Sequence, residues 1–161
     1  MNTVDILMYG DRTLRSTLET IPQDRWLDQG VCGWWSVKDI LGHLASYELW
    51  HGDVLQAAAG QAETPHLDEF KEQGHTFNEV QVARRADHSA SQVLDEYIAA
   101  HDRLMEAARA VPPESFVMNG TIPWYGNEYS IDDLLVYTSY GHKREHCAQI
   151  HVFKDRIRAG A

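Results

Sequence analysis

Apolar residues recur three, four and seven positions apart along four long segments of the chain, which is the spacing of an amphipathic α-helix. These segments span residues 3–21, 36–59, 89–111 and 130–158. No run of alternating apolar and polar residues bounded by turn residues predicts a β-strand. The sequence therefore predicts an all-α fold, a four-helix bundle in which the apolar faces are buried against one another.

Helix start and stop signals support these boundaries. Ser36 and Ser130 are each followed three residues later by an aspartate, which resembles a capping box with Asp in place of the usual Glu. Either Ser89 or Ser91 begins the third long helix. The first three long helices are each followed by a helix-breaking residue: Pro22, Gly60 and the pair Pro112–Pro113.

The segments that join the long helices are also informative. Residues 67–86 contain Gly74, and the pattern on either side predicts short helices over 67–73 and 77–85. The second and third long helices are therefore expected to be joined by a long crossover. The later linker, residues 114–129, is long and aromatic, so we expect it to cover part of the bundle.

Composition limits the classes of partner. The chain has 161 residues, with 14 Lys and Arg against 24 Asp and Glu, for a formal net charge of −10. We expect one domain over residues 1–161, and the acidic surface argues against nucleic acids and anionic membranes. Only two cysteines are present, and neither a leader nor a membrane-spanning run is found. These features predict a cytoplasmic protein that acts on a small molecule.

The nine histidines are the candidate chemical groups. His142 and His146 are four residues apart, so on a helix they lie only about 40° from one another. Gln149 lies within about 20° of His142 and is a candidate to orient an imidazole. His151 falls about 180° from His142, on the opposite face. Two imidazoles at i and i+4 are typical of metal-binding helices.

His43 lies in the second long helix, at the edge of its apolar face and beside Tyr47. A lone histidine inside a bundle leaves a polar nitrogen buried, so a partner on another helix meets a physical need. Three converging imidazoles would bind Zn²⁺, Ni²⁺ or Fe²⁺ and leave a position open for catalysis. The alternative is that all three are hydrogen-bonded core histidines. The others are expected to be surface or capping residues: His51, His66, His75, His88, His101 and His151.

Two stretches resemble the DinB/YfiT-like superfamily. Residues 33–48, GWWSVKDILGHLASYE, resemble its second-helix signature, in which a Trp-Ser pair opens a helix with one histidine. Residues 142–150, HKREHCAQI, resemble its last-helix pattern of two histidines four apart, followed by Gln and an aliphatic residue. Length, helix count and crossover agree as well. The resemblance implies that His43, His142 and His146 bind one divalent metal ion.

Residues 77–78, 101–104 and 124–130 further resemble a subgroup that includes colibactin self-resistance and related protective proteins. Members of that subgroup often lack the complete histidine set, whereas this chain keeps it. Trp124 and Tyr125 directly precede Gly126, the expected hinge, and are predicted to form a lid over the substrate. Tyr47 and Asn78 are the other candidate pocket residues.

The resemblance implies a metal-dependent small-molecule enzyme, either a hydrolase or a transferase that uses a low-molecular-weight thiol. Activated water is the suspected catalytic group, and no catalytic side chain is assigned. The alternative is a non-catalytic protein that sequesters a toxic or apolar compound. We also expect a homodimer, because residues 6–9 of the first helix are apolar in succession and symmetric pairs are common.

Overall fold

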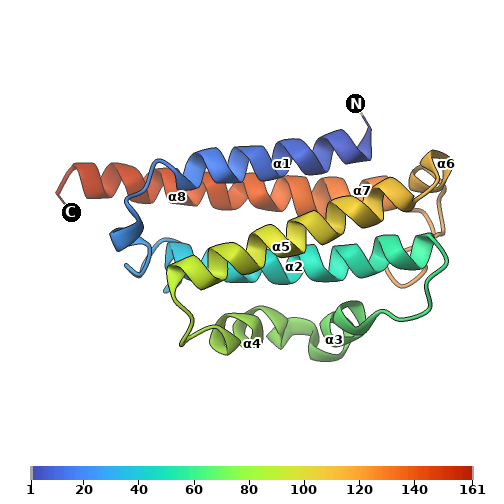
Figure 1. The fold of residues 1–161 in the computed structure, drawn as a ribbon, viewed down its shortest axis with the longest axis horizontal. Helices are drawn as coiled ribbons and strands as arrows, with labels where there is room; N and C mark the ends of the chain where they lie inside the picture. The colour runs from blue at the N-terminus through green and yellow to red at the C-terminus, as the bar shows by residue number, and fades with distance from the viewer. Residues whose placement is uncertain (1, 161) are drawn as a thin grey trace.

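The computed structural model describes residues 2–160 and contains no β-strand within that range. The bundle is formed by four long helical segments, of which the last is made of three pieces. They are α1 (Thr3–Leu18), α2 (Val37–Ala58), α5 (Ala90–Ala110), and the run of α7 (Ile131–Leu135), a π-helix (Val136–Gly141) and α8 (His142–Arg158). In Figure 1, α2 and α5 run in one direction while α1 and α8 run in the other. The predicted all-α bundle is confirmed.

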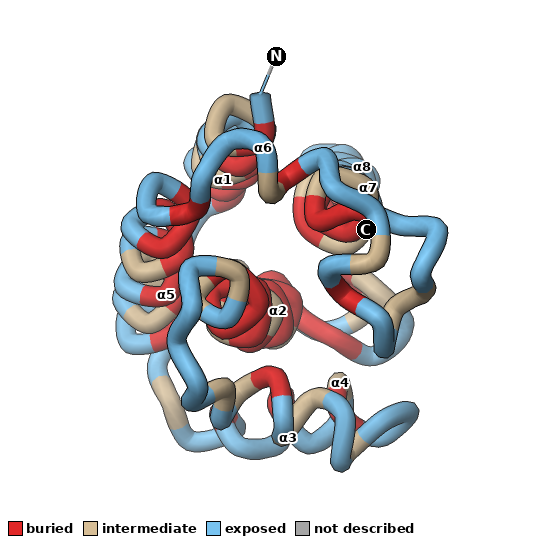
Figure 2. Tube along the Cα trace, turned by 90° about the vertical axis from the view of Figure 1, so that its right-hand side faces the viewer, coloured by how far each residue is buried: buried red, intermediate tan, exposed pale blue. Residues whose placement is uncertain are grey.

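The long crossover between α2 and α5 allows these two helices to run in the same direction. It consists of α3 (Pro65–Gln73), a 3₁₀ turn (Gly74–Thr76) and α4 (Phe77–Arg84), which lie outside the bundle along α2. The end-on view of Figure 2 shows the buried side of each long helix turned toward a common interior. A further 3₁₀ turn (Gln23–Arg25) follows α1, and α6 (Pro113–Phe116) follows α5. The two predicted short helices are confirmed.

Both predicted capping boxes, at Ser36 and at Ser130, form. Asp39 N donates to Ser36 Oγ at 3.1 Å, and Ser36 N donates to Asp39 Oδ2 at 2.9 Å. The same exchange joins Ser130 and Asp133. Ser89, rather than Ser91, caps α5. Each box satisfies backbone donors that have no partner within the helix.

The π-helix at Val136–Gly141 corrects the prediction of one continuous α-helix over 130–158. A π turn inserts an extra residue, so the 100° step of an α-helix does not carry across it. The angles around the helix that were calculated from the sequence remain valid within α8, where His142, His146 and Gln149 all lie. They do not relate α8 to α7.

A polar layer divides the apolar interior into two clusters. The first cluster includes Trp35, Tyr97 and Ile150, and the second includes Trp50, Leu104 and Leu134. Each long helix contributes a charged or titratable residue between the clusters: Asp11, Glu48, His101 and Lys143. Among residues 2–160, no helix is long and apolar enough to cross a membrane.

Candidate metal centre

Three imidazole rings converge where α2 faces the first turns of α8. His43 Nε2 lies 2.9 Å from His142 Nε2, which in turn lies 3.0 Å from His146 Nε2. One ring nitrogen from each residue falls within 4.8 Å of the other two. The structure therefore brings together the three histidines that the sequence singled out, across 99 residues of chain.

Aromatic rings hold His43 from both sides. The centroid of Trp35 lies 4.9 Å from that of His43, and the centroid of Tyr47 lies 4.7 Å from it. Trp35 lies directly before the capped start of α2, and Trp35 and His43 are both buried. The side chain of His43 is thereby confined to one direction, toward α8.

The donor set fits a cation better than it fits hydrogen bonds alone. His142 Nε2 faces two other Nε2 atoms at hydrogen-bonding distance, and a neutral imidazole nitrogen offers either one proton or one lone pair. A single atom of this kind cannot form two full hydrogen bonds with the others. Three lone pairs directed at one ion satisfy all of these nitrogens together.

The rings are held in the neutral form that metal binding requires. Burial lowers the pKa of His43 to about 2, and the nearby His142 and His146 act in the same direction. Burial, with His146 and Lys143, lowers the pKa of His142 to about 4. The pKa of His146 is also lowered by burial. Neutral imidazoles are free to act as ligands without first losing a proton.

Gln149 contacts one of the three rings. Its Oε1 lies 2.8 Å from His146 Nδ1, one turn along α8. In contrast, Nδ1 of His43 and Nδ1 of His142 are buried without a hydrogen-bond partner in the described part of the chain. Gln149 is the one candidate orienting residue that the sequence suggested, and the structure places it on His146.

Two of the four predicted pocket residues lie at the cluster. The ring of Tyr47 lies 4.5 Å from that of His142 between centroids, and burial raises the pKa of its hydroxyl. The Tyr47 hydroxyl donates to Asn78 Oδ1 at 3.4 Å. Tyr47 and half-buried Asn78 therefore form a polar edge beside the histidines, supplied by α2 and α4.

Trp124 and Tyr125 lie farther away, beyond a second aromatic layer. Trp50 and Phe70 stack with centroids 4.4 Å apart, and the centroid of Trp124 lies 6.3 Å from Trp50 and 6.4 Å from Phe70. Trp124 lines a hollow of about 460 Å³, where Lys71 Nζ sits 5.0 Å above its ring. None of the three histidines is among the described residues that line this hollow.

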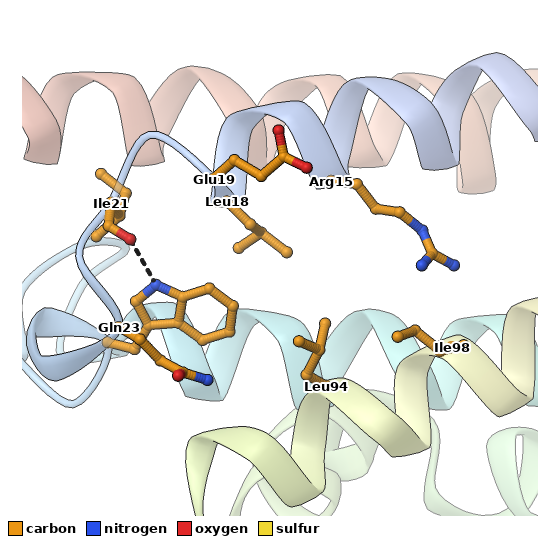
Figure 3. Close-up of a pocket in the computed structure, with 8 residues that line it drawn as sticks. Arg15, Leu18, Glu19, Ile21, Gln23, Leu94 and Ile98 are labelled. Carbon is orange, nitrogen blue, oxygen red and sulfur yellow. Dashed lines mark hydrogen bonds between the residues drawn. The ribbon is translucent and has the colours of Figure 1, made fainter.

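A second hollow, of about 360 Å³, opens between α1 and α5 (Figure 3). Arg15 lies on α1 and Glu19 directly after its last residue, and Leu94 and Ile98 face them from α5. Trp26 also lines this hollow, and its Nε1 donates to the Ile21 carbonyl at 3.2 Å. None of the described residues that line this second hollow was predicted from the sequence to belong to a site.

The prediction that the other histidines are surface or capping residues is wrong for His51 and His101. His51 is fully buried, with Nε2 lying 2.8 Å from Thr138 Oγ1. His101 is 5% exposed and its Nδ1 lies 2.6 Å from Glu48 Oε2. In both cases a residue from another helical segment supplies the hydrogen bond that a buried imidazole needs.

The buried pair Glu48–Lys143 was not foreseen. Lys143 Nζ donates to Glu48 Oε1 at 2.6 Å, and both side chains are 1% exposed. Burial acts to raise the pKa of Glu48, but Lys143 and then His101 lower it to about 2. A signal was present in the sequence: Glu48 lies four residues after the core residue Leu44. A charge on the apolar stripe of a helix indicates a buried partner.

The chain matches a known family over most of its length. Residues 7–127 match the family described as the mycothiol maleylpyruvate isomerase N-terminal domain. The matched stretch includes His43 and ends before His142 and His146. No curated protein and no solved structure matches the chain.

Proposed function

Because the chain belongs to the mycothiol maleylpyruvate isomerase N-terminal domain family, within the DinB/YfiT-like superfamily, we propose that it is a metal-dependent thiol enzyme. His43, His142 and His146 would hold one divalent ion, either Zn²⁺, Ni²⁺ or Fe²⁺. The reaction proposed is transfer of a low-molecular-weight thiol, of the kind named by the family, to a small electrophilic substrate. Hydrolysis of a small molecule is the related reaction that the same centre would support.

One observation carries this proposal: three Nε2 atoms from α2 and α8 meet with no hydrogen-bonding arrangement that satisfies them all. A divalent ion held by three neutral imidazoles is a Lewis acid that lowers the pKa of a thiol or of water. Three protein ligands are typical of catalytic centres, whereas structural zinc sites have four.

The side chains around the cluster have separate roles in the proposal. Gln149 orients His146, and Trp35 confines His43. Tyr47 and Asn78 provide hydrogen-bonding groups beside the histidines, where the amide of Asn78 would bind a substrate carbonyl. Substrate and thiol would thereby be held close together, which is a large part of catalysis by proximity.

We place this activity in the cytoplasm and on small molecules. Both cysteines, Cys32 and Cys147, are free, as is typical of a reducing compartment. The formal charge of −10 repels nucleic acid phosphates.

The first test is metal analysis of protein purified without added metal or a metal-chelating column. We expect stoichiometric divalent metal, lost in His43→Ala, His142→Ala and His146→Ala and kept in His151→Ala. His151 is exposed, so it is a matched histidine on the same helix. Stoichiometric metal in the triple variant would overturn the proposal. The second test measures consumption of mycothiol with electrophilic substrates, which His142→Ala should abolish.

A second function, sequestration of an apolar compound without catalysis, is favoured by the hollow beside Trp124. This hollow is separated from the histidines by the stacked rings of Trp50 and Phe70. A compound bound there would not need to reach the metal. Under this alternative, ligand uptake survives removal of the metal by a chelator and depends on Trp124 and Tyr125.

A further inference from the structure

We propose that the buried ion pair between Glu48 and Lys143 is a positioning device for the histidine cluster. In this inference the pair sets the rotation of α8 about its axis, so that His142 and His146 face His43. It rests on the metal site proposed above. Neither residue is proposed to touch the metal or the substrate, so each is a positioning residue.

Two hydrogen bonds fix the direction of the Lys143 side chain. Its Nζ donates to Glu48 Oε1 at 2.6 Å and to Ser139 Oγ at 2.9 Å. Glu48 is fixed in turn, because its other oxygen lies 2.6 Å from His101 Nδ1. Gly10 of α1 lies close to the stem of this side chain, since a Cβ placed there would meet Lys143 Cδ at 3.5 Å, an ordinary van der Waals distance. The Lys143 side chain therefore has little freedom to move.

The pair joins the same two helices as the histidines do, but on different faces. Lys143 follows His142 directly, so it points about 100° away around α8. Glu48 lies five residues after His43, about 140° around α2. One link between two helices fixes their distance. Two links on different faces also fix how each helix is rotated.

A contact that fixes the rotation of the helix is needed at the start of α8. The π-helix Val136–Gly141 ends directly before His142, so α8 does not inherit the helical register of α7. Ser139 lies in the π-helix and Lys143 in α8, and their hydrogen bond spans the junction. The direction of His142 is therefore determined by contacts made at this junction.

Energetics also favour a positioning role over a stabilising one. A buried ion pair recovers little more than the cost of removing two charges from water, and apolar residues of similar size often stabilise as well or better. The pair is therefore poor evidence for stability as such. Apolar replacements would not reproduce the directional contacts of the pair.

The test compares Lys143→Met and Glu48→Gln with the control Lys38→Met. Lys38 is also a buried lysine, but it lies in the first turn of α2 and donates to the carbonyls of Arg85, Ala86 and His88 rather than to a group on α8. Each metal-free protein is titrated with Co²⁺, whose visible absorption reports ligand geometry. We expect Lys143→Met and Glu48→Gln to bind Co²⁺ about tenfold more weakly, with a changed spectrum. Lys38→Met should lose stability while keeping the wild-type affinity and spectrum.

The outcomes separate this inference from the proposed function. A wild-type protein that does not bind Co²⁺ overturns both. Wild-type binding together with unchanged affinity and spectrum in the folded variants overturns the positioning role alone. If Lys143→Met does not fold, Glu48→Gln decides, because it keeps the shape and an accepting oxygen. Loss of folding in both variants, with Lys38→Met folded, would show that the pair holds the fold and would overturn the inference.

Discussion

Gln149 Oε1 lies 2.8 Å from His146 Nδ1, and because an amide oxygen only accepts, this contact places the ring proton on Nδ1. His146 Nε2 then carries the lone pair that faces His142. We predict that Gln149→Leu lowers metal affinity about tenfold, since the orienting bond is lost. Asp155→Asn, an exposed change farther along the same helix, is the control. Equal affinities of the two variants, measured by competition with a chelator, would contradict the prediction.

The metal-free protein should lose stability as the pH falls below about 6.5. Burial places the pKa of His43 at about 2, of His51 at about 3 and of His142 at about 4, against 6.5 for an exposed imidazole. The unfolded chain therefore takes up protons that the folded chain does not, until His142 titrates near pH 4. At about pH 5 each residue should lower the free energy of unfolding by about 2 kcal/mol.

Urea denaturation at about pH 7.5 and about pH 5 measures this loss. The double variant His43→Gln/His142→Gln removes two of the buried titrating rings and should show a smaller decrease. An unfolding free energy that is the same at both pH values would show that these rings are not held neutral.

The loop of Trp124 and Tyr125 is predicted to contact the substrate without holding the metal. The double variant Trp124→Ala/Tyr125→Ala should keep its metal content, because Trp50 and Phe70 lie between the loop and Tyr47. Uptake of a compound that binds in the hollow beside Trp124 should fall strongly. Tyr9→Ala, which removes an exposed ring on α1, is the control. Unchanged uptake in the double variant would place the substrate away from this loop.

Gly126 should tolerate alanine less well than Gly30 does. Both have a positive φ, 145° and 89°, which costs an alanine about 1–2 kcal/mol. A Cβ at Gly126 would in addition lie 2.8 Å from the ring of Tyr129, whereas a Cβ at Gly30 meets nothing within 4 Å. Thermal unfolding of the two alanine variants should therefore show the larger loss at Gly126. Equal losses would mean that Tyr129 moves aside freely.

A homodimer through α1 remains a prediction. Of the apolar run that suggested it, Leu7 is fully buried, while Met8 and Tyr9 are 45% and 44% exposed. Met8→Glu/Tyr9→Glu should convert the dimer to an 18.3 kDa monomer, as measured by light scattering. Val152→Glu, on an exposed position of α8, should leave the dimer intact. A wild-type protein that is monomeric at micromolar concentration would exclude this assembly.

Features set by local sequence were the ones that could be predicted. Ser36 with Asp39 marks a helix start because both partners lie within one turn. His142 and His146 share a face for the same reason, since both lie within α8. His43 was a candidate from its place at the edge of an apolar face, but its assignment to the same site relied on the family resemblance, because its position opposite α8 depends on how the helices pack.

Features set by contacts between helices could not be predicted. His51 is buried by Thr138, which lies 87 residues away, and His101 by Glu48, which lies 53 residues away. The π-helix carries no proline that would indicate a break in its sequence, VYTSYG. It occurs where Ser139 and Lys143 face the interior while Tyr137 stays exposed, which is a requirement of packing rather than of local preference.

The polar layer limits how the four helices can slide along one another. Asp11, Glu48, His101 and Lys143 meet at one level of the bundle, each from a different helix. If one helix slipped by a single turn, its charged or titratable group would enter an apolar cluster and its former partners would be left buried without it. Apolar side chains alone would accept several such alignments. The layer therefore selects one axial alignment of the bundle, and a slipped form is excluded by the cost of an unpaired buried charge.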